Sequence, residues 1–236
     1  MLRNSNLQFT NATQLNDPFD CHPALIDFSN VPVNEHNWPP ASFLKDKGEK
    51  DMSNLRNRAW ICSLSKLHNS VPMWAYYSKH MGVCIGLNIE KAKSYLSKIQ
   101  CSFYIGAKVI EVQYRDVAEK PDYFNDSKDY FHYLLSTKAN NWAHEQEVRL
   151  VLEDPSPTIM ASLFKPKRNE VVDWKRVRAY PHIGGECFES LYLGIEIDKK
   201  QKEQVILEAR RCNPNIRIYK MEVDTEAFRL KEVQVL

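Results

Sequence analysis

Two carboxylates and a guanidinium alternate with apolar side chains in one short stretch of this sequence. Glu145, Glu147 and Arg149 stand two residues apart, and the alternate positions 148, 150 and 152 are apolar. Because successive side chains of a strand point to opposite faces, the three charged groups are expected to share one face. A carboxylate can stabilise positive charge that develops in a reaction, and a guanidinium can bind phosphate oxygens bidentately. The same pattern is also typical of an edge strand with a solvated polar face.

A second group of polar residues lies near the start of the chain, in Asn16-Asp-Pro-Phe-Asp20. Asx side chains bond nearby backbone amides and Pro18 presets φ, so this segment is predicted to form a rigid turn. We expect the aromatic ring of Phe19 to anchor the turn in the core. Asp17 and Asp20 then either cap the turn or contribute to a polar site.

The elements that must position these groups follow from the spacing of apolar residues. Helical spacing in residues 130–144 predicts a long helix, with Trp142 on its inward stripe, that runs into the strand 145–152. The prolines of residues 22–48 predict an irregular excursion, followed by a short helix at 49–57. Further helices are expected at 70–81, 90–99 and 199–211, with His80 near a helix end. Further strands are expected at 7–10, 58–64, 83–89, 108–114, 190–197, 216–223 and 229–236, the last two as an antiparallel pair.

Composition limits the class of protein. A chain of 236 residues is long enough for one elaborate α+β domain, which we predict over residues 1–236. The formal net charge of +2 is too small to indicate nucleic acid or membrane through bulk electrostatics, and the basic stretches 165–168 and 175–178 read as solvated surface. No apolar run approaches the roughly 20 residues of a membrane span. The six cysteines include no C-x-x-C pair, so we expect reduced thiols, no metal site and a cytoplasmic protein.

Several of these segments, in this order, resemble the largely bacterial domain-of-unknown-function family 2971. The resemblance rests on Asn16-Asp-Pro-Phe-Asp20 after the first strand, on Met73-Trp-Ala-Tyr-Tyr77 followed by His80-Met-Gly82, and on Trp142-Ala-His-Glu-Gln-Glu-Val-Arg149. It extends from about residue 7 to about residue 219. The family pattern places a Tyr-Lys-Tyr-like strand and a helix earlier still, so we expect an N-terminally shortened version of it.

At lower resolution the layout resembles ADP-ribosyltransferases that use NAD. This resemblance implies a mixed, mainly antiparallel split sheet with flanking helices, a Ser on a middle strand and Glu-x-Glu on a late strand. Ser63 and Glu145-Gln-Glu147 stand at those positions. In such a site Glu147 stabilises the oxocarbenium charge, while Glu145 orients the acceptor or a water. Aromatic rings would stack on nicotinamide or adenine, and Arg149 would bind the pyrophosphate.

Three functions remain open. The first is an NAD-dependent ADP-ribosyltransferase or NAD-glycohydrolase-like effector, placed in bacterial phage defence, with NAD as substrate and a protein, nucleic acid or water as acceptor. The second is a non-catalytic module that senses a nucleotide or a protein. The third is a nuclease in which Asp17, Asp20 and Glu147 surround a divalent metal. For the first two functions, the candidate residues are Glu147 and Glu145 as catalytic groups and Asn16, Asp17, Phe19, Asp20, Ser63, Trp74, Tyr77 and Arg149 as binding groups.

Overall fold

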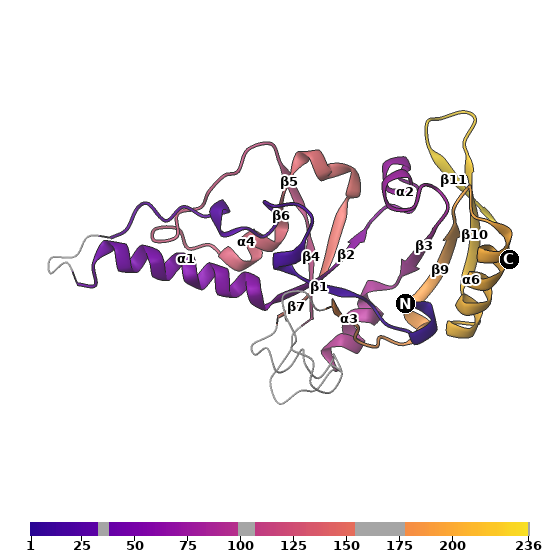
Figure 1. Cartoon of the computed structure of the whole chain (residues 1–236), viewed down its shortest axis with the longest axis horizontal. Coiled ribbons are helices and arrows are strands. Elements are labelled where there is room, and N and C mark those ends of the chain that lie inside the picture. Colours follow the sequence, from indigo (N-terminus) through magenta and orange to yellow (C-terminus); the bar gives the residue numbers. More distant parts are fainter. Residues whose placement is uncertain (33–37, 99–106, 154–177, 236) are drawn as a thin grey trace.

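Two β-sheets and their flanking helices form the molecule in this computed structural model, which describes residues 1–32, 38–98, 107–153 and 178–235. The strand orders are β4-β7-β2-β1-β8 and β11-β10-β9-β3 (Figure 1). The pairing between strands is mainly antiparallel, and β9 and β10 run parallel. The α+β class with mainly antiparallel sheets is therefore confirmed.

The first sheet carries the charged stretch on an interior strand, β7. Its strands are β4 (Ala107–Glu111), β7 (Glu147–Glu153), β2 (Ala59–Ser65), β1 (Phe9–Asn11) and β8 (Arg178–Ala179). The strand β7 pairs with β2 on one side and β4 on the other, and its residues 147–152 are all buried. The reading of this stretch as a solvated edge strand is therefore wrong. Ser63 pairs with Arg149 and Ser65 pairs with Glu147, so the polar face of β7 continues onto β2.

The second sheet is formed mostly by the C-terminal part of the chain. Its strands are β3 (Val83–Leu87), β9 (Phe188–Leu193), β10 (Arg217–Val223) and β11 (Leu230–Gln234). The predicted antiparallel pairing of the last two strands is confirmed. The helices of this half are α2 (Val71–Ser78), α3 (Ile89–Ser97) and α6 (Lys199–Cys212), and the short 3-10 helices are η1 (Leu2–Asn4) and η6 (Gly185–Cys187).

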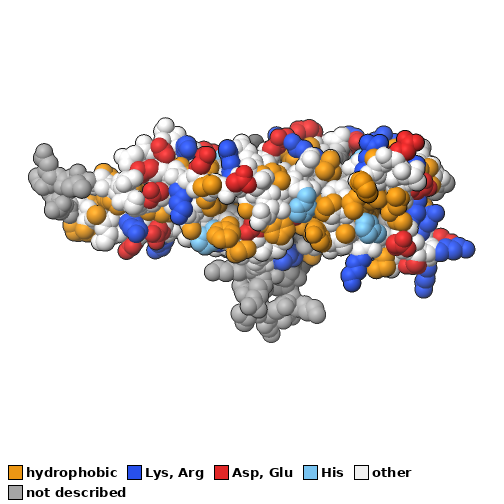
Figure 2. Space-filling view, turned by 90° about the horizontal axis from the view of Figure 1, so that it is seen from above, with side chains coloured by type: hydrophobic (Ala, Val, Ile, Leu, Met, Phe, Trp, Pro, Cys, Tyr) orange, Lys and Arg blue, Asp and Glu red, His pale blue; other side chains and the backbone are white. Residues whose placement is uncertain are grey.

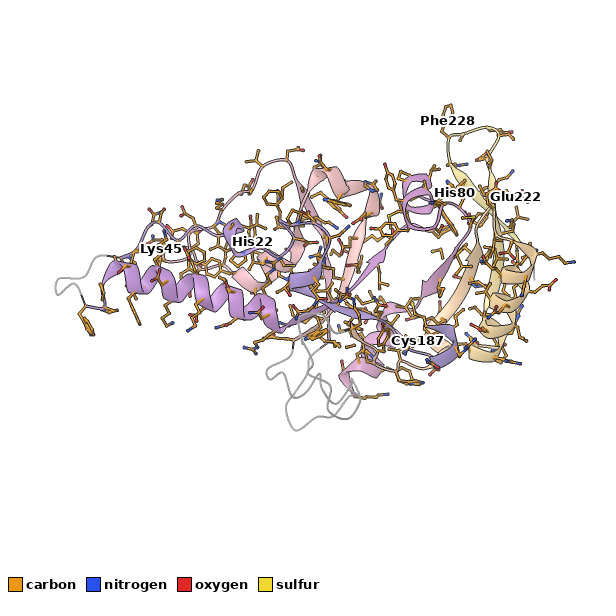
Figure 3. The ribbon with its side chains drawn as sticks, viewed as in Figure 1. His22, Lys45, His80, Cys187, Glu222 and Phe228 are labelled. Carbon is orange, nitrogen blue, oxygen red and sulfur yellow. The ribbon has the colours of Figure 1, made fainter. Side chains whose placement is uncertain are left out.

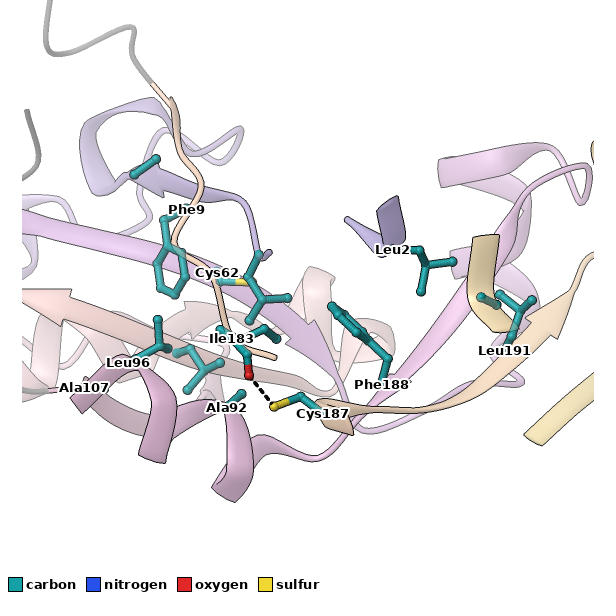
Figure 4. Close-up of a cluster of buried hydrophobic side chains, with 14 of the residues drawn as sticks. Leu2, Phe9, Cys62, Ala92, Leu96, Ala107, Ile183, Cys187, Phe188 and Leu191 are labelled. Atoms are coloured by element: carbon teal, nitrogen blue, oxygen red, sulfur yellow. Dashed lines mark hydrogen bonds between the residues drawn. The ribbon is translucent and has the colours of Figure 1, made fainter. Parts of the chain in front are cut away.

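The main hydrophobic core joins the two sheets. It combines Phe9 of β1 with Phe188 of β9 and Leu96 of α3, all fully buried (Figure 4). The Cys187 thiol in this core donates to the carbonyl of Ile183 at 2.8 Å. Alternating apolar residues of β7 and β2 face this core, which leaves their polar face for the opposite side of the first sheet.

On that opposite side lie α1 (Ala41–Arg58), η2 (Ala12–Gln14), η3 (Pro23–Leu25) and α4 (Tyr130–Ser136). The prediction of irregular structure up to residue 48 is wrong, because α1 already begins at Ala41. Pro40 is the N-cap of this helix, where a missing backbone N–H and a fixed φ cost little. The prolines thus fix where the helix begins rather than forbid it.

The predicted long helix over residues 130–144 is also wrong. After α4 ends, the chain forms the strand β6 (Thr137–Ala139) beside β5 (Gln113–Arg115) and then the 3-10 helix η4 (Asn140–Glu145). Parallel pairing of β6 with β5 overrides the helical spacing, which continues by sequence alone to Trp142. Trp142 is half-buried instead of belonging to the core.

The surface carries both apolar and charged groups. Figure 2 shows one face of the molecule, on which hydrophobic side chains gather toward the end that carries the second sheet, interspersed with charged groups. No helix within the described ranges has both the length and the apolar character that crossing a membrane requires. The five cysteines within those ranges are free thiols, as expected. Cys101 and the basic stretch 165–168 lie outside the described residues.

Candidate functional site

Arg149 is the centre of a buried cluster of charged side chains on the polar face of the first sheet. Its Nε donates to Oε1 of Glu147 at 2.8 Å and its Nη2 to Oε2 of the same carboxylate at 3.1 Å. The Nη2 group also donates to Oδ2 of Asp20 at 2.7 Å, and Nη1 donates to the carbonyl of Leu135 at 3.0 Å. The guanidinium is 0% exposed. One side chain therefore joins β7, the turn after η2 and the end of α4.

Lys138 of β6 completes this charge cluster, which we define as Asp20, Lys138, Glu145, Glu147 and Arg149. Its Nζ donates to Oε2 of Glu145 at 2.6 Å and to Oε2 of Glu147 at 2.9 Å. It also lies 3.9 Å from Oδ2 of Asp20. The break between α4 and η4 brings this lysine inward, because β6 points its side chain at β7. Three carboxylates and two cations are thus bonded in one continuous buried chain.

Burial and neighbouring charge act in opposite directions on these groups. Burial disfavours the carboxylate of Glu147, but the hydrogen bonds and charge of Arg149, together with Lys138, outweigh it and lower its pKa to about 2. For Asp20 burial prevails over the same two cations, and its pKa is raised. Burial also disfavours the ammonium of Lys138, yet the adjacent glutamates raise its pKa. Glu147 is therefore a fixed anion at neutral pH and a poor proton donor or acceptor.

Three hydroxyl groups connect the cluster to its surroundings. Tyr77 of α2 donates to Oε1 of Glu145 at 2.8 Å, and its ring is 63% exposed. Burial of the hydroxyl, followed by this hydrogen bond, raises the pKa of Tyr77 to about 12. The hydroxyl of Tyr114 accepts from the backbone N–H of Glu147 at 2.8 Å. The exposed Ser63 lies close enough to the Glu147 carboxylate to lower its pKa.

The Asn16–Asp20 turn lies against the cluster through Asp20 alone. Asp17 accepts from the backbone N–H of Phe19 at 2.9 Å, and Asn16 accepts from the N–H of Asp17 at 3.1 Å. These bonds form a turn in which Asp17 caps the backbone. The ring of Phe19 is 65% exposed, so the expectation that it anchors the turn in the core is wrong. The anchor is instead the ion pair between Asp20 and Arg149.

Trp74, one of the predicted binding residues, belongs to the hydrophobic core and is not a member of the charge cluster. Its ring packs in a separate core cluster with Met221 and Leu230, and its Nε1 donates to the carbonyl of His68 at 2.7 Å. A ring buried in this way has no face open to a ligand. The structure therefore brings together the predicted Asp20, Tyr77, Glu145, Glu147 and Arg149, with Ser63 at their edge, and leaves Trp74 in the core.

Lys138 is the member of the cluster that the sequence did not reveal. It was placed inside an expected helix, where a lone lysine reads as a solvated residue. A break in the helical spacing after Ser136, where Thr137 is β-branched, is a weak signal for the strand that turns Lys138 inward. Its ammonium also lies 5.0 Å from the ring centroid of Trp142, which places a π-face over the charge.

The nuclease hypothesis required Asp17, Asp20 and Glu147 to surround one metal ion. The guanidinium of Arg149 occupies the space between Asp20 and Glu147, and Asp17 is engaged in its own turn. A cation already bonded to two carboxylates leaves them no free oxygen pair for a metal. Within the described ranges, no group of three or more His, Cys, Asp or Glu residues is arranged to hold a metal ion.

A cavity lies between the two sheets, on the other face of β2 and β7 from the charge cluster. This inter-sheet cavity has a volume of about 530 Å³. Apolar side chains from β2, β3, β4, β7 and α3 line it: Leu64, Ile85, Leu87, Ile89, Val109 and Val148. Lys66, His68, Glu90 and Glu111 are among its polar lining residues. The cavity was not predicted, because its walls are adjacent only when the two sheets pack together.

Tyr192 of β9 lines the inter-sheet cavity with an aromatic stack. The ring centroids of His68 and Tyr192 lie 4.5 Å apart with the planes 22° from parallel. Tyr219 stacks on Tyr192 at 5.1 Å. The cavity and the cluster meet at Ser65, whose hydroxyl donates to the carbonyl of Glu145 at 2.7 Å.

Comparison with known protein families gives a match in the middle of the chain. A family model described as protein of unknown function (DUF2971) matches residues 73–150. The DUF2971 match contains four members of the charge cluster, namely Lys138, Glu145, Glu147 and Arg149, and it also contains Tyr77. Asp20 and Ser63 precede it. No curated protein and no solved structure matches the chain.

Proposed function

We propose that this chain is a non-catalytic binding module whose ligand occupies the inter-sheet cavity. The observation that carries the proposal is the cavity itself, about 530 Å³ in volume, with apolar walls and a few polar groups. Small-molecule sites have this size and this composition, and they commonly lie where two structural layers meet. Residues 73–150, which match the DUF2971 model, contribute β3, β4 and the start of β7 to its walls.

The ligand that we propose is a nucleoside or nucleotide. The stack of His68 and Tyr192 supports this choice, because a planar base can pack against aromatic rings in an offset arrangement. Lys66, paired with Glu111 at 2.9 Å, supplies a donor and an acceptor for the polar edge of such a ring. A purely aliphatic ligand would leave these polar groups without a role.

The charge cluster supports binding rather than turnover. Both cations of the cluster are bonded to Glu147, so its charge is already neutralised in place. A carboxylate in this state has little charge left to stabilise an oxocarbenium ion. The cluster instead fixes β2 and β7 relative to the Asp20 turn, and these strands form one wall of the inter-sheet cavity.

Thermal unfolding of the full chain with adenosine, guanosine, uridine and their 5′-monophosphates tests the proposal. Binding to the native state adds RT ln(1 + [L]/Kd) to its stability, so a ligand raises the melting temperature. We expect Val109→Phe, which fills the cavity, to abolish that rise. The matched control is Val117→Phe at a 74% exposed valine outside the cavity, and it should respond as the unmodified chain does. If none of these compounds shifts the unmodified chain, the nucleoside proposal fails.

A second candidate is an NAD glycohydrolase or ADP-ribosyltransferase, which the position of Ser63 favours. Ser63 is exposed while the carboxylate beside it, Glu147, is buried, so a substrate at Ser63 would lie next to that charge. Release of nicotinamide from NAD is the measurement. For a catalytic Glu147 we expect release by the unmodified chain and a loss of about 100-fold or more in Glu147→Gln. Equal release by both proteins, or none by the unmodified chain, would exclude this role. Ser63→Ala serves as a second variant, because it removes the hydroxyl beside Glu147 and keeps the ion pairs of that carboxylate with Lys138 and Arg149.

A further inference from the structure

We propose that a second cavity, between α1 and the segment 22–29, binds the phosphoryl group of a small molecule that also carries hydroxyl groups. This α1 cavity has a volume of about 650 Å³. None of its lining residues belongs to the charge cluster or lines the inter-sheet cavity. Its ionisable lining residues are His22, Asp27, Lys45, Glu49, Arg56 and Lys120.

One side of α1 forms a wall of the α1 cavity. The lining positions on this helix recur at three- or four-residue spacing, which places them along one stripe. They include Lys45, Glu49, Ser53 and Arg56. The segment that begins at His22 and continues through η3 forms the facing wall. Figure 3 shows His22 and Lys45 on the same side of α1. A molecule in the cavity therefore meets side chains from both walls.

Arg56 and His22 place accessible N–H groups close together at this cavity. Nη2 of Arg56 donates to the carbonyl of Asp20 at 3.2 Å, which fixes the guanidinium against the Asn16–Asp20 turn. Its Nη1 makes no hydrogen bond within the described residues and, unlike its Nε, is not shut off from solvent. Nδ1 of His22 accepts from the N–H of Ala24 at 3.0 Å, so the neutral ring carries its proton on Nε2, which is likewise accessible. Both groups can donate to the oxygens of a phosphoryl group.

The cations at the α1 cavity are available to an anion. None of the three lysine and arginine side chains that line it forms an ion pair with an acidic residue within the described ranges. Lys45 and Glu49, four residues apart, are not paired, whereas Lys47 and Asp51, with the same spacing on the same helix, pair at 3.0 Å. Unpaired positive charge at a cavity attracts a negatively charged ligand.

Two carboxylates at the cavity limit the ligand to one anionic group. Oδ1 of Asp27 accepts from the backbone N–H of Ser29 at 2.8 Å, so this carboxylate stabilises a turn. The carboxylate of Glu49 is exposed and makes no hydrogen bond within the described ranges. It can accept from the hydroxyl groups of a ligand, and it would repel a second anionic group. The volume is that of a small-molecule site rather than of a single phosphate ion. A sugar phosphate combines these properties.

Sugars with and without a phosphoryl group are the matched probes. We expect calorimetric titration of the full chain to show saturable binding of glucose 6-phosphate or ribose 5-phosphate. The Kd should be about tenfold or more below that of the corresponding free sugar, because the charge-assisted hydrogen bonds are lost with the phosphoryl group. No saturable binding of either sugar phosphate, or equal affinities with and without the phosphoryl group, would overturn the proposal. So would inorganic phosphate that binds as tightly as the sugar phosphates, because the hydroxyl groups would then contribute nothing.

Lys45→Gln locates the binding, because Lys45 is exposed and can be replaced without disturbing the fold. We expect it to weaken the binding of the sugar phosphate several-fold. The matched control is Lys47→Gln, at a lysine that is 60% exposed on the same helix but does not line the cavity, and it should bind as the unmodified chain does. Equal weakening by both variants would overturn the proposal. So would binding that Val109→Phe abolishes and Lys45→Gln leaves intact, because it would place the ligand in the inter-sheet cavity.

The ring of His22 gives a direct readout of a bound phosphoryl group. Burial, followed by the charge of Arg56, holds the pKa of His22 below its ordinary value. A phosphoryl group beside the ring adds negative charge, so we expect the sugar phosphate to raise this pKa and the free sugar to leave it unchanged. The other charged groups that line the cavity are the same in both titrations: Asp27, Lys45, Glu49 and Lys120. Proton NMR of the ring C–H signals, assigned with His22→Gln, measures the pKa. A pKa of His22 that is the same with and without the sugar phosphate would overturn the proposal.

Discussion

Arg149 and Asp20, which are 129 positions apart in the sequence, form an ion pair of 2.7 Å in which neither side chain is more than 2% exposed. The same guanidinium binds Glu147, so one cation joins an early turn to β7, an interior strand of the first sheet. A buried charge is tolerated only while its partners remain. The stability of the whole polar face therefore depends on this residue.

Replacing Arg149 by Met is expected to destabilise the chain by about 3–5 kcal/mol, because Asp20 and Glu147 then lose a cation that compensates their burial. Equilibrium unfolding in urea measures the change. The matched control is Arg3→Met, which removes the pair with Glu208 from an arginine that is 71% exposed, and it should change the stability little. Similar unfolding midpoints for Arg149→Met and the unmodified chain would contradict the role assigned to the cluster.

Ionisation of the Glu147 carboxylate makes the stability of the folded chain depend on pH. Its pKa falls from an ordinary value of 4.5 to about 2 on folding, so its contribution is complete above the unfolded pKa and is lost as the pH falls from about 4.5 to about 2. This shift corresponds to a contribution on the order of 3 kcal/mol. The raised pKa of Asp20 acts in the opposite direction and offsets part of it.

Comparison with Glu147→Gln isolates that contribution, because the amide does not titrate. We expect the stability difference between the two proteins in urea unfolding to shrink as the pH is lowered from 5 toward 2. Asp20 titrates in both proteins, so its contribution to the free energy of unfolding largely cancels in the difference. A difference that stays constant over that range would show that the carboxylate of Glu147 is not held ionised by its partners.

The pKa of Tyr77, whose ring is exposed, depends on the charge of the buried Glu145. Burial of its hydroxyl and the hydrogen bond to Glu145 raise its pKa to about 12, so it should ionise later than an ordinary tyrosine. The difference in ultraviolet absorbance between the unmodified chain and Tyr77→Phe during alkaline titration gives this pKa. In a Glu145→Gln background the pKa of Tyr77 should fall toward 10, because a neighbouring anion no longer opposes the phenolate. An unchanged pKa in that background would exclude the hydrogen bond in solution.

Gly194 permits the close approach that fixes His80. A Cβ at this position would collide with the backbone carbonyls of His80 and Gly82, which cannot rotate away. We expect Gly194→Ala to destabilise the chain by about 1–3 kcal/mol through overpacking, measured by urea unfolding. A free energy of unfolding equal to that of the unmodified chain would contradict this close packing.

Much of the secondary structure could be predicted from local patterns. The strands β2 and β7 and the helix α6 follow from periodicity over seven or more residues, and the last antiparallel pair follows from two alternating runs. The shared face of Glu147 and Arg149 was predicted for the same reason, since a strand alternates by necessity. The pattern did not indicate whether that face is solvated or buried.

Only the tertiary structure decided whether the charged side chains of β7 are buried and which residues they pair with. Pairing of β6 with β5 interrupts the helical spacing and turns Lys138 into the cluster, and packing of β4 against β7 buries a strand that looked like an edge. The inter-sheet cavity has walls drawn from segments distant in the chain. The sequence thus determined which residues could be charged neighbours along one strand, because that depends on local geometry. Their burial, their partners and the inter-sheet cavity depended on contacts between distant segments, which no local pattern encodes.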